Sequence, residues 1–447
     1  MHKGGSKEKG KFRPISILPV SSKIIERLVF DQFYMYLNEN RILNVYQSGF
    51  RPHHSTNTAL LNITDDWLIC FDNGKIICVI YLDLKKAFDT VDFQLLLLKL
   101  RYNGADEQTI KWFASYLNGR IQSTSVNGVP STSRPVSCGI PQGSILGPLL
   151  FILFINDLPM GLKYCKVSMF ADDTLLYCEG SEVTDICSKV NEDLEYVKMW
   201  LDNNKLSLNV EKTEFMFLGT RSRLNNINEV DVNIKIGEQK LIRVKKCKHL
   251  GVIIDENLTW QDHIAHVQKK TGCGLHMLKT VKPYVDKPTL QMVYNAIVSS
   301  HLNYCDSVWD NCGVTLSNKL QKVQNRGARI INGSSWDSSG KQNLSKLNWI
   351  SLVDKREENT AKMMLKILNN QAPQYLCDKF SYIDKKYNTR QSKLNVNKIQ
   401  PHNNSGKRTF QFRGAQVWNS LPDALKSASS INILKKGLSD LRKKLSC

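Results

Sequence analysis

The chain has 447 residues, 42% of them hydrophobic, which is enough to bury a large core and to form about three or four subdomains. It carries 61 Lys and Arg against 41 Asp and Glu, a formal net charge of +20, which indicates a polyanionic partner and makes nucleic acid the first candidate. The longest apolar run, 145–155, contains Gly147 and Pro148 and is shorter than the roughly 20 residues that a bilayer requires, so we expect no membrane-spanning segment.

Two amphipathic helices are predicted near the N-terminus. Apolar residues take up helical spacing from about Ser21 to Asn38, and again from about Ser55 onward. Between them, Gln47-Ser48-Gly49-Phe50-Arg51 predicts a loop.

A buried strand is predicted next, because 76–82 is nearly all apolar, and Asp83 follows it directly. Asp106 can cap a helix that stops at Gly119. The pair Asn127-Gly128 predicts a tight turn between extended stretches.

A mixed order of helices and strands follows. Pro141-Gln142-Gly143-Ser144 opens an apolar helix that runs to Asp157. Later strands are predicted over 167–171, 175–178, 215–218 and 249–254, with a helix through Leu194, Val197 and Leu201 between the second and third of them. The fold class is therefore α+β.

Two adjacent acids, Asp172 and Asp173, lie between two of these strands. Consecutive residues inside a strand point to opposite faces, whereas at a hairpin tip both can turn toward one point. Together with Asp83 they would supply the carboxylate oxygens needed by two divalent cations roughly 3.5–4 Å apart. The alternative is ordinary turn chemistry, and the chain carries a second such pair, Asp65-Asp66, in a predicted helix.

From Thr259 onward the pattern becomes helical, which indicates a separate helical subdomain. Thr259 with Asp262 resembles a capping box. Long helices are predicted near 261–279, 287–302 and 314–332.

Positive charge is concentrated at two places in this C-terminal half. The last of these helices carries one cationic stripe at three- and four-residue steps, formed by Lys319, Lys322, Arg326 and Arg329. The stripe fits a phosphate backbone, and an ordinary solvated helix face is the alternative. Residues 385–447 hold fourteen Lys or Arg but only Asp423 and Asp440 as acids, so we expect this region to contact phosphates.

The aromatic residues of the C-terminal region have two possible roles. Phe410, Phe412 and Trp418 either stack on bases or, as we favour, form a small core.

Twelve cysteines occur without a C-x-x-C pair and without a start that resembles a signal peptide, which predicts a reducing, intracellular environment. Several lie in apolar runs typical of buried free thiols: Cys70, Cys78, Cys165 and Cys178.

Six sequence blocks occur in the order that reverse transcriptases show. They are Arg13-Pro14-Ile15-Ser16, Ser48-Gly49-Phe50-Arg51, the stretch 81–89 (YLDLKKAFD), Gly139-Ile140-Pro141-Gln142-Gly143-Ser144, Phe170-Ala171-Asp172-Asp173 and His249-Leu250-Gly251. With them the chain closely resembles reverse transcriptases of non-LTR retrotransposons of the jockey or CR1 kind. The resemblance is strong over about residues 8–255 and looser to the C-terminus.

The resemblance implies a right-hand polymerase fold. Its parts would be N-terminally truncated fingers over 1–75, a palm with an antiparallel sheet and interleaved fingers elements over 76–255, a helical thumb over 256–345, and a basic C-terminal region over 346–447. It implies an RNA-directed DNA polymerase in which a primer 3′-hydroxyl attacks the α-phosphate of a deoxynucleotide. Two Mg²⁺ ions, with Mn²⁺ as a substitute, would be held by Asp83, Asp172 and Asp173. The implied partners are an RNA template, a DNA primer or nicked target DNA, and dNTPs.

The resemblance also assigns residues around the nucleotide. Phe88 matches the aromatic gate that crowds a ribose 2′-hydroxyl, with core packing as the alternative. Gln142 and Gly143 match the block that borders nucleotide and template, with a plain loop leading into a helix as the alternative. Lys212 matches a lysine near the triphosphate, and Leu84 adjoins Asp83 in its block.

Further matches concern phosphate and primer contacts. Arg13 and Arg51 match basic fingers positions suited to triphosphate or template phosphate, with exposed salt bridges as the alternative. Leu250 and Gly251 match the primer-grip turn, where glycine lets the backbone approach the primer.

Met1 begins almost on the first block, so we expect the N-terminal extension and the endonuclease domain of such enzymes to be absent and the chain not to cut DNA. Two other functions compete: a catalytically impaired, truncated remnant that only binds nucleic acid, and an RNA-dependent RNA polymerase, which Phe88 disfavours. Import into the nucleus is expected from the resemblance, although the cluster Arg442-Lys443-Lys444 is too short to establish it.

Overall fold

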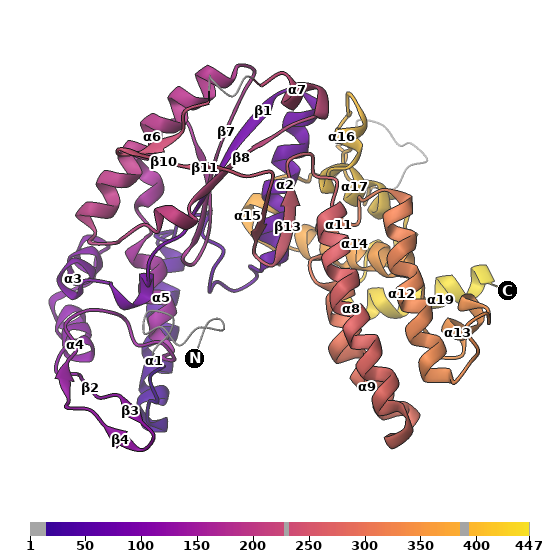
Figure 1. Cartoon of the computed structure of the whole chain (residues 1–447), viewed down its shortest axis with the longest axis horizontal. Coiled ribbons are helices and arrows are strands. Elements are labelled where there is room, and N and C mark those ends of the chain that lie inside the picture. The colour runs from indigo at the N-terminus through magenta and orange to yellow at the C-terminus, as the bar shows by residue number, and fades with distance from the viewer. Residues whose placement is uncertain (1–14, 228–231, 385–392, 447) are drawn as a thin grey trace.

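The computed structural model describes residues 15–227, 232–384 and 393–446, which form an arch (Figure 1). A β-sheet lies at the top, and helical arms descend on either side of it. We call the two arms the fingers arm and the thumb arm, and the mixed α+β class is confirmed. The domain boundaries given above remain predictions.

The main sheet has five strands in the order β11-β8-β1-β7-β6. The central strand, β1 (Ile76–Leu82), pairs antiparallel with β7 (Asp173–Gly180) and with β8 (Glu214–Leu218), and all seven of its residues are buried. β6 (Lys166–Phe170) forms a hairpin with β7, while β11 (Ile242–Arg243) runs parallel to β8. The strand predicted over 76–82 is thereby confirmed.

Each face of the sheet packs against its own helices. On one face Ile77 and Val79 join a core with α2 (Thr56–Asp72), including its fully buried Trp67. On the other face Ile76, Cys78 and Ile80 join a core with α5 (Leu146–Phe154) and α6 (Val183–Asn203). Because both faces of the sheet are covered, the side chains on both sides of β1 are apolar, and its sequence is one continuous apolar run.

The fingers arm consists of helices and short hairpins. Its helices are α1 (Val20–Glu39), α3 (Phe93–Tyr102) and α4 (Glu107–Leu117). Asp106 caps α4 as predicted, accepting a hydrogen bond from the Thr109 amide at 2.8 Å. Its short strands are β2 (Ile121–Gln122), β3 (Ser125–Val126), β4 (Val129–Pro130) and β5 (Arg134–Pro135). The predicted turn at Asn127-Gly128 joins β3 to β4, both residues having positive φ.

The thumb arm holds long helices beside a hairpin. The hairpin is β12 (Lys246–His249) with β13 (Val252–Asp255), and the helices are α8 (Gln261–Val281), α9 (Lys287–Tyr294) and α12 (Val314–Asn332). The last helix has the bounds that the periodicity predicted. A π-helical turn (Asn295–Ser299) and α10 (Ser300–Asn303) continue α9, followed by α11 (Asp306–Trp309).

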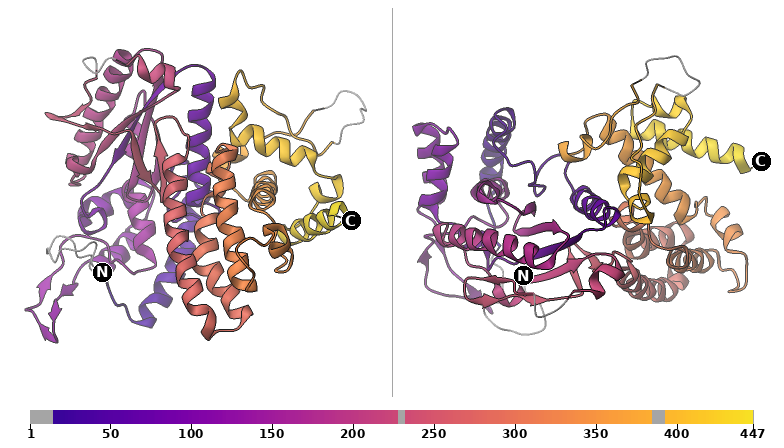
Figure 2. Two further views of the ribbon diagram at one scale, coloured as in Figure 1. Left: turned by 45° about the vertical axis from the view of Figure 1, so that its right-hand side comes forward. Right: turned by 90° about the horizontal axis from the view of Figure 1, so that it is seen from above.

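The C-terminal helices share one hydrophobic core with α2 and the thumb. The longest are α14 (Leu352–Leu368), α17 (Phe410–Ser420) and α19 (Ile431–Ser446), packed along the outer side of the thumb (Figure 2). Phe410 and Trp418 are each 1% exposed, so their predicted role in a core is confirmed. The remaining elements are α7 (Arg221–Asn225), β9 (Lys235–Ile236), β10 (Gln239–Lys240), α13 (Gly340–Ser345), α15 (Gln374–Cys377), α16 (Asn404–Lys407) and α18 (Asp423–Lys426), with several 3₁₀ turns between elements.

Two local predictions were wrong. The strand expected over 249–254 is split by a turn, because Leu250 and Gly251 both adopt positive φ and fold it into the β12–β13 hairpin. The capping box of Thr259 and Asp262 is absent, since α8 begins after Trp260 and the Asp255 carboxylate accepts the amides of Thr259 and Trp260. The helix expected over 287–302 is confirmed in extent, and it contains one π-helical turn.

The cysteine prediction is confirmed for the part of the chain that the structure describes. Its eleven cysteines are free thiols, and Cys70, Cys78, Cys165 and Cys178 are buried. Within the same residues, none of the helices combines the length and apolar character needed to cross a bilayer.

Candidate active site

The acids from two distant segments meet at one end of the sheet. The β1–β7 register pairs Leu82 with Thr174, so Asp83 follows directly opposite Asp173 and beside the β6–β7 turn that holds Asp172. Asp83 and Asp172 line one cavity of about 810 Å³. Asp173, the first residue of β7, is exposed.

Asn209 holds Asp83 in place. Its side-chain Nδ2 donates to Asp83 Oδ2 at 2.8 Å, and its backbone amide donates to the Asp83 carbonyl at 2.7 Å. Buried Thr213 adds an acceptor for the Asp83 amide at 3.4 Å. The sequence analysis did not identify Asn209 as a site residue. Its position three residues before Lys212 was the feature of the sequence that could have indicated it.

Gln47 fixes the turn that presents Asp172. Its fully buried Oε1 accepts hydrogen bonds from the amides of Gly49, at 2.7 Å, and Ala171, at 3.0 Å. Ala171 itself has a φ of 57°, a left-handed conformation that L residues rarely adopt. The loop over 47–51 and the acidic turn are therefore one hydrogen-bonded unit, although more than a hundred residues separate them.

Gly49 is required by this contact. A Cβ at residue 49 would lie 2.4 Å from the Ala171 backbone nitrogen. We expect Gly49→Ala to lower the free energy of unfolding by about 1–3 kcal/mol, because backbone on both sides must move. Urea denaturation measures this difference. The matched control is Gly272→Ala in α8, where a Cβ meets nothing within 4 Å and helix propensity predicts a gain of up to about 1 kcal/mol. If Gly49→Ala did not lower the free energy of unfolding, the close approach of residue 49 to the Ala171 backbone would be contradicted.

Phe88 forms an aromatic wall of the cavity. Its ring stacks on Phe151 at a centroid distance of 4.1 Å and meets the edge of Phe50 at 6.3 Å. Phe88 therefore packs against the core and lines the cavity at the same time, so the two roles considered for it are compatible.

The block around Gln142 also borders the cavity. Gln142 Nε2 donates to Asp89 Oδ1 at 2.7 Å, which orients the amide. Gly143 has a φ of 105°, and a Cβ there would lie 2.9 Å from the Ser16 carbonyl oxygen, so its close approach is to a backbone segment of the fingers. Leu84 and exposed Lys212 complete the predicted residues that line this cavity.

Other predicted residues lie outside the cavity. Arg51 donates through Nη1 to the carbonyl oxygens of Asn44, at 2.7 Å, and Gln47, at 3.1 Å, so its guanidinium braces the 47–51 loop. Arg13 lies outside the described residues.

The turn matched to the primer grip contacts the thumb. Leu250 and Gly251 form the tip of the β12–β13 hairpin, and the Tyr304 hydroxyl donates to the Leu250 carbonyl at 2.8 Å. A Cβ at residue 251 would lie 3.0 Å from the Tyr304 ring. Burial lowers the pKa of His249, at the base of this turn, to about 4, so its imidazole is neutral at pH 7.

The cationic stripe lies on α12, and three of its four members are exposed. Lys319, Lys322 and Arg326 are exposed, whereas Arg329 is half-buried and its Nε donates to the Ser338 carbonyl at 2.9 Å. One end of the predicted stripe is thus engaged within the protein.

The donors in the cavity suit a hard divalent cation. Among the described residues, no group of three Asp, Glu, His or Cys side chains is close enough to enclose an ion by itself. Mg²⁺ is commonly bound through one or two carboxylates, with substrate phosphates and waters as the other ligands. Asp83 and Asp172 match that pattern, because they face one open cavity from adjoining elements.

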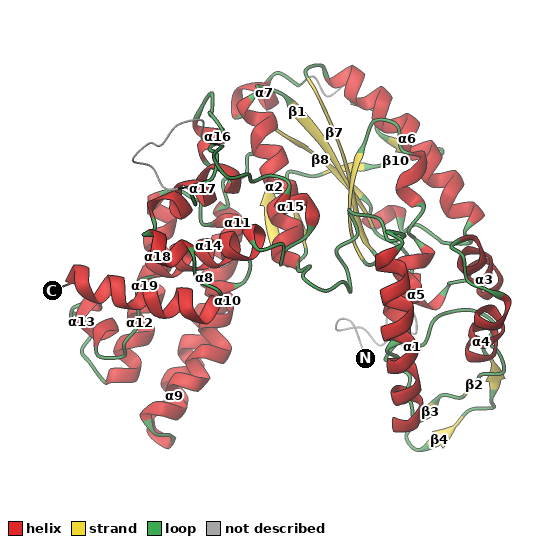
Figure 3. Cartoon of the chain, turned by 180° about the vertical axis from the view of Figure 1, so that it is seen from behind, coloured by secondary structure: helices red, strands yellow, loops and turns green. Residues whose placement is uncertain are grey.

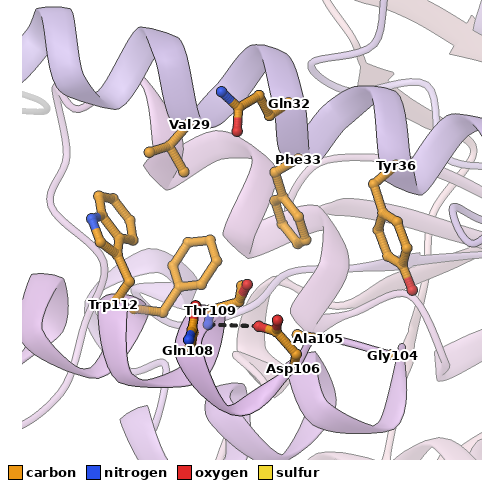
Figure 4. Close-up of a pocket in the computed structure, with 11 residues that line it drawn as sticks. Val29, Gln32, Phe33, Tyr36, Gly104, Ala105, Asp106, Gln108, Thr109 and Trp112 are labelled. Carbon is orange, nitrogen blue, oxygen red and sulfur yellow. Dashed lines mark hydrogen bonds between the residues drawn. The ribbon is translucent and has the colours of Figure 1, made fainter.

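A second cavity, of about 540 Å³, lies between α1 and α4 (Figure 4). Phe33, Trp112 and Phe113 give it an apolar lining. The one acid in it, Asp106, already caps α4. The described residues of its lining include neither paired carboxylates nor Lys or Arg, unlike the lining of the cavity of Asp83 and Asp172.

Comparison with known proteins agrees with this geometry. A family model described as reverse transcriptase (RNA-dependent DNA polymerase) matches residues 2–254. The RNA-directed DNA polymerase from mobile element jockey of Drosophila melanogaster is 27% identical over 336 residues, covering 73% of this chain and 36% of that protein. The probable RNA-directed DNA polymerase from transposon BS of the same species is 28% identical, covering 74% of this chain and 37% of that protein.

The chain spans about a third of the length of these curated relatives. A solved structure of apo telomerase from Candida tropicalis aligns with a TM-score of 0.38 and 12% identity, covering 80% of this chain and 61% of that one.

Proposed function

The chain belongs to the reverse transcriptase (RNA-dependent DNA polymerase) family, and we propose that it copies RNA into DNA as the polymerase of a jockey-like non-LTR retrotransposon. The observation that carries this proposal is the β1–β7 register, which brings Asp83 to the acidic turn at the edge of a cavity also lined by Phe88, Gln142 and Lys212.

In the proposed reaction Asp83, Asp172 and Asp173 hold two Mg²⁺ ions, which supply positive charge for the primer 3′-hydroxyl and for the pyrophosphate leaving group. Asn209 keeps the Asp83 carboxylate oriented. Phe88 crowds the position of a ribose 2′-hydroxyl and so selects deoxynucleotides. Lys212 lies where it can donate a proton to the departing pyrophosphate.

The proposed partners are an RNA template, a DNA primer or nicked target DNA, and dNTPs. Exposed Lys319, Lys322 and Arg326 contact phosphates of the bound strands, while Leu250 and Gly251 position the primer. Affinity for the primer–template falls as salt rises, because each phosphate contact releases counterions. Such a protein works in the nucleus, where its target DNA lies.

Primer extension on an RNA template tests the proposal. The unaltered chain is supplied with Mg²⁺ and either dNTPs or rNTPs, alongside Asp172→Ala. We expect DNA synthesis by the unaltered chain and a loss of about a thousandfold or more in the variant, because a lost metal-binding carboxylate removes charge stabilisation at the reacting centre. Binding without synthesis by the unaltered chain would favour the remnant, and a preference for rNTPs would favour an RNA polymerase.

A further inference from the structure

A polar cavity of about 390 Å³ lies between the thumb and the C-terminal helices. Its walls come from the π-helical turn, the loop before α14, and from α14 and α19. α19 packs on α14, on the side of the thumb that faces the viewer in Figure 3. Of the described residues, none lines both this cavity and the active-site cavity.

The cavity has a surplus of positive charge. Its carboxylate, Glu358, is 4% exposed and pairs with Lys355 at 3.4 Å, with Arg442 at 3.0 Å and with Lys362. Burial alone would raise the pKa of Glu358, but hydrogen bonds from Lys362 and Arg442 bring it to about 2. Exposed Lys435 on α19 adds a further cation to the same wall. Of the charged side chains that line the cavity, Glu358 is negative, whereas Lys355, Lys435 and Arg442 are positive.

An aromatic surface lines the same cavity. Trp349 is half-buried, lines the cavity and stacks on Tyr294 at a centroid distance of 4.5 Å. The Tyr294 ring fixes the indole, so a ligand that contacts Trp349 meets a rigid aromatic partner.

Amide side chains complete the lining. Exposed Asn348 has a φ of 55°, and Asn295 begins the π-helical turn. Turns of this kind are rare and occur frequently at functional sites. Amide groups can donate to and accept from the edges of a base.

We propose that this cavity binds one unpaired nucleotide of single-stranded RNA. The base stacks on Trp349, Asn348 and Asn295 hydrogen-bond its edge, and Lys435 and Arg442 contact the flanking phosphates. A single strand is required because duplex bases are stacked inside the helix, whereas splayed bases are free to stack on aromatic side chains. This contact lies apart from the active site and does not depend on polymerase activity.

Fluorescence anisotropy with a fluorescein-labelled uridine hexanucleotide tests the proposal on the full chain. Lys435→Glu is expected to weaken binding by about tenfold and to lower the salt slope by about one. Lys436→Glu is the matched control, with the same charge change on the next residue of α19, outside the cavity lining. The control variant should change the affinity by less than about twofold.

The aromatic contact has its own pair of variants. Trp349→Leu should weaken binding by about tenfold, the scale of one lost base–aromatic stack, whereas Trp349→Phe should retain most of the affinity. The Phe variant keeps the test valid if Leu disturbs folding. Equal losses of affinity in Lys435→Glu and Lys436→Glu would overturn the proposal. Full affinity in Trp349→Leu would also overturn it, because the cavity would then bind only the phosphates. Competition by free uridine monophosphate at the affinity of the hexanucleotide would also overturn it, because the strand would contribute nothing.

Discussion

Asp83→Asn is expected to abolish primer extension, lowering the rate by about a thousandfold or more, while the protein stays folded. Asp83 directly follows β1 and lines the cavity together with Asp172. The amide has nearly the same shape but lacks the charge that a divalent cation needs. The free energy of unfolding should be unchanged or higher, since the substitution removes repulsion between Asp83 and the neighbouring acidic turn.

Single-turnover extension and urea denaturation, measured on the same preparation, separate these effects. Glu211→Gln is the matched control, because this acid is exposed, lies close in sequence to Asn209 and does not line the cavity. Extension by Asp83→Asn at a rate within tenfold of the unaltered chain would contradict a role for Asp83 in the reaction.

Asn209→Ala should give an intermediate loss of about 10–100-fold in the extension rate and a higher Mg²⁺ requirement, as expected of a residue that orients a metal ligand.

The elements that the sequence predicted well are those with one dominant local signal. The all-apolar run 76–82 admits little except a strand covered on both faces, and the structure gives it those bounds. The periodicity of 314–332 likewise sets both ends of α12, where Gly333 in a left-handed conformation terminates the helix.

The two errors have different causes. The run 249–254 is apolar enough for one strand, but Leu250 takes a positive φ at a turn whose carbonyl accepts a hydrogen bond from Tyr304, more than fifty residues away. The second error is local, because the Asp255 carboxylate, four and five residues earlier, accepts the amides of Thr259 and Trp260 and α8 begins only after them.

Distance along the chain also limits what the sequence predicts of the candidate site. Asp83 and Asp172 could be found because acids at strand ends are a recognisable pattern, and both line the cavity. Gln47 and Asn209 were missed because a neutral amide carries no such pattern, and each acts on a segment more than a hundred residues away. The role predicted for Asp173 as a third metal ligand stays a prediction, for a residue that is exposed at the start of β7.

The contacts of the basic C-terminal region could not be predicted from its composition. Its charge predicted a phosphate-binding tail, yet its helices are attached through the acids of α2, which packs on the main sheet. The Asp65 carboxylate, 1% exposed, accepts the amides of Phe410 and of Gln411, the latter at 3.0 Å, at the start of α17. Lys379 lies 4.0 Å from Asp65 and 2.9 Å from Asp66. The Asp65-Asp66 pair, which the sequence analysis noted only as adjacent acids in a predicted helix, therefore contacts another part of the chain.

Asp65→Ala is expected to lower the free energy of unfolding by about 3 kcal/mol, because it leaves buried amides at a helix N-terminus without an acceptor and removes a partner from Lys379. Urea denaturation measures the loss, and limited proteolysis should show faster cleavage around α17. Asp31→Ala is the matched control, since Asp31 pairs with Arg27 on the exposed surface of α1, where an ion pair contributes about 0–1 kcal/mol. Equal losses in the two variants, or unchanged proteolysis in Asp65→Ala, would mean that the C-terminal helices are held by their shared core alone and that the α2 acids contribute little to their attachment.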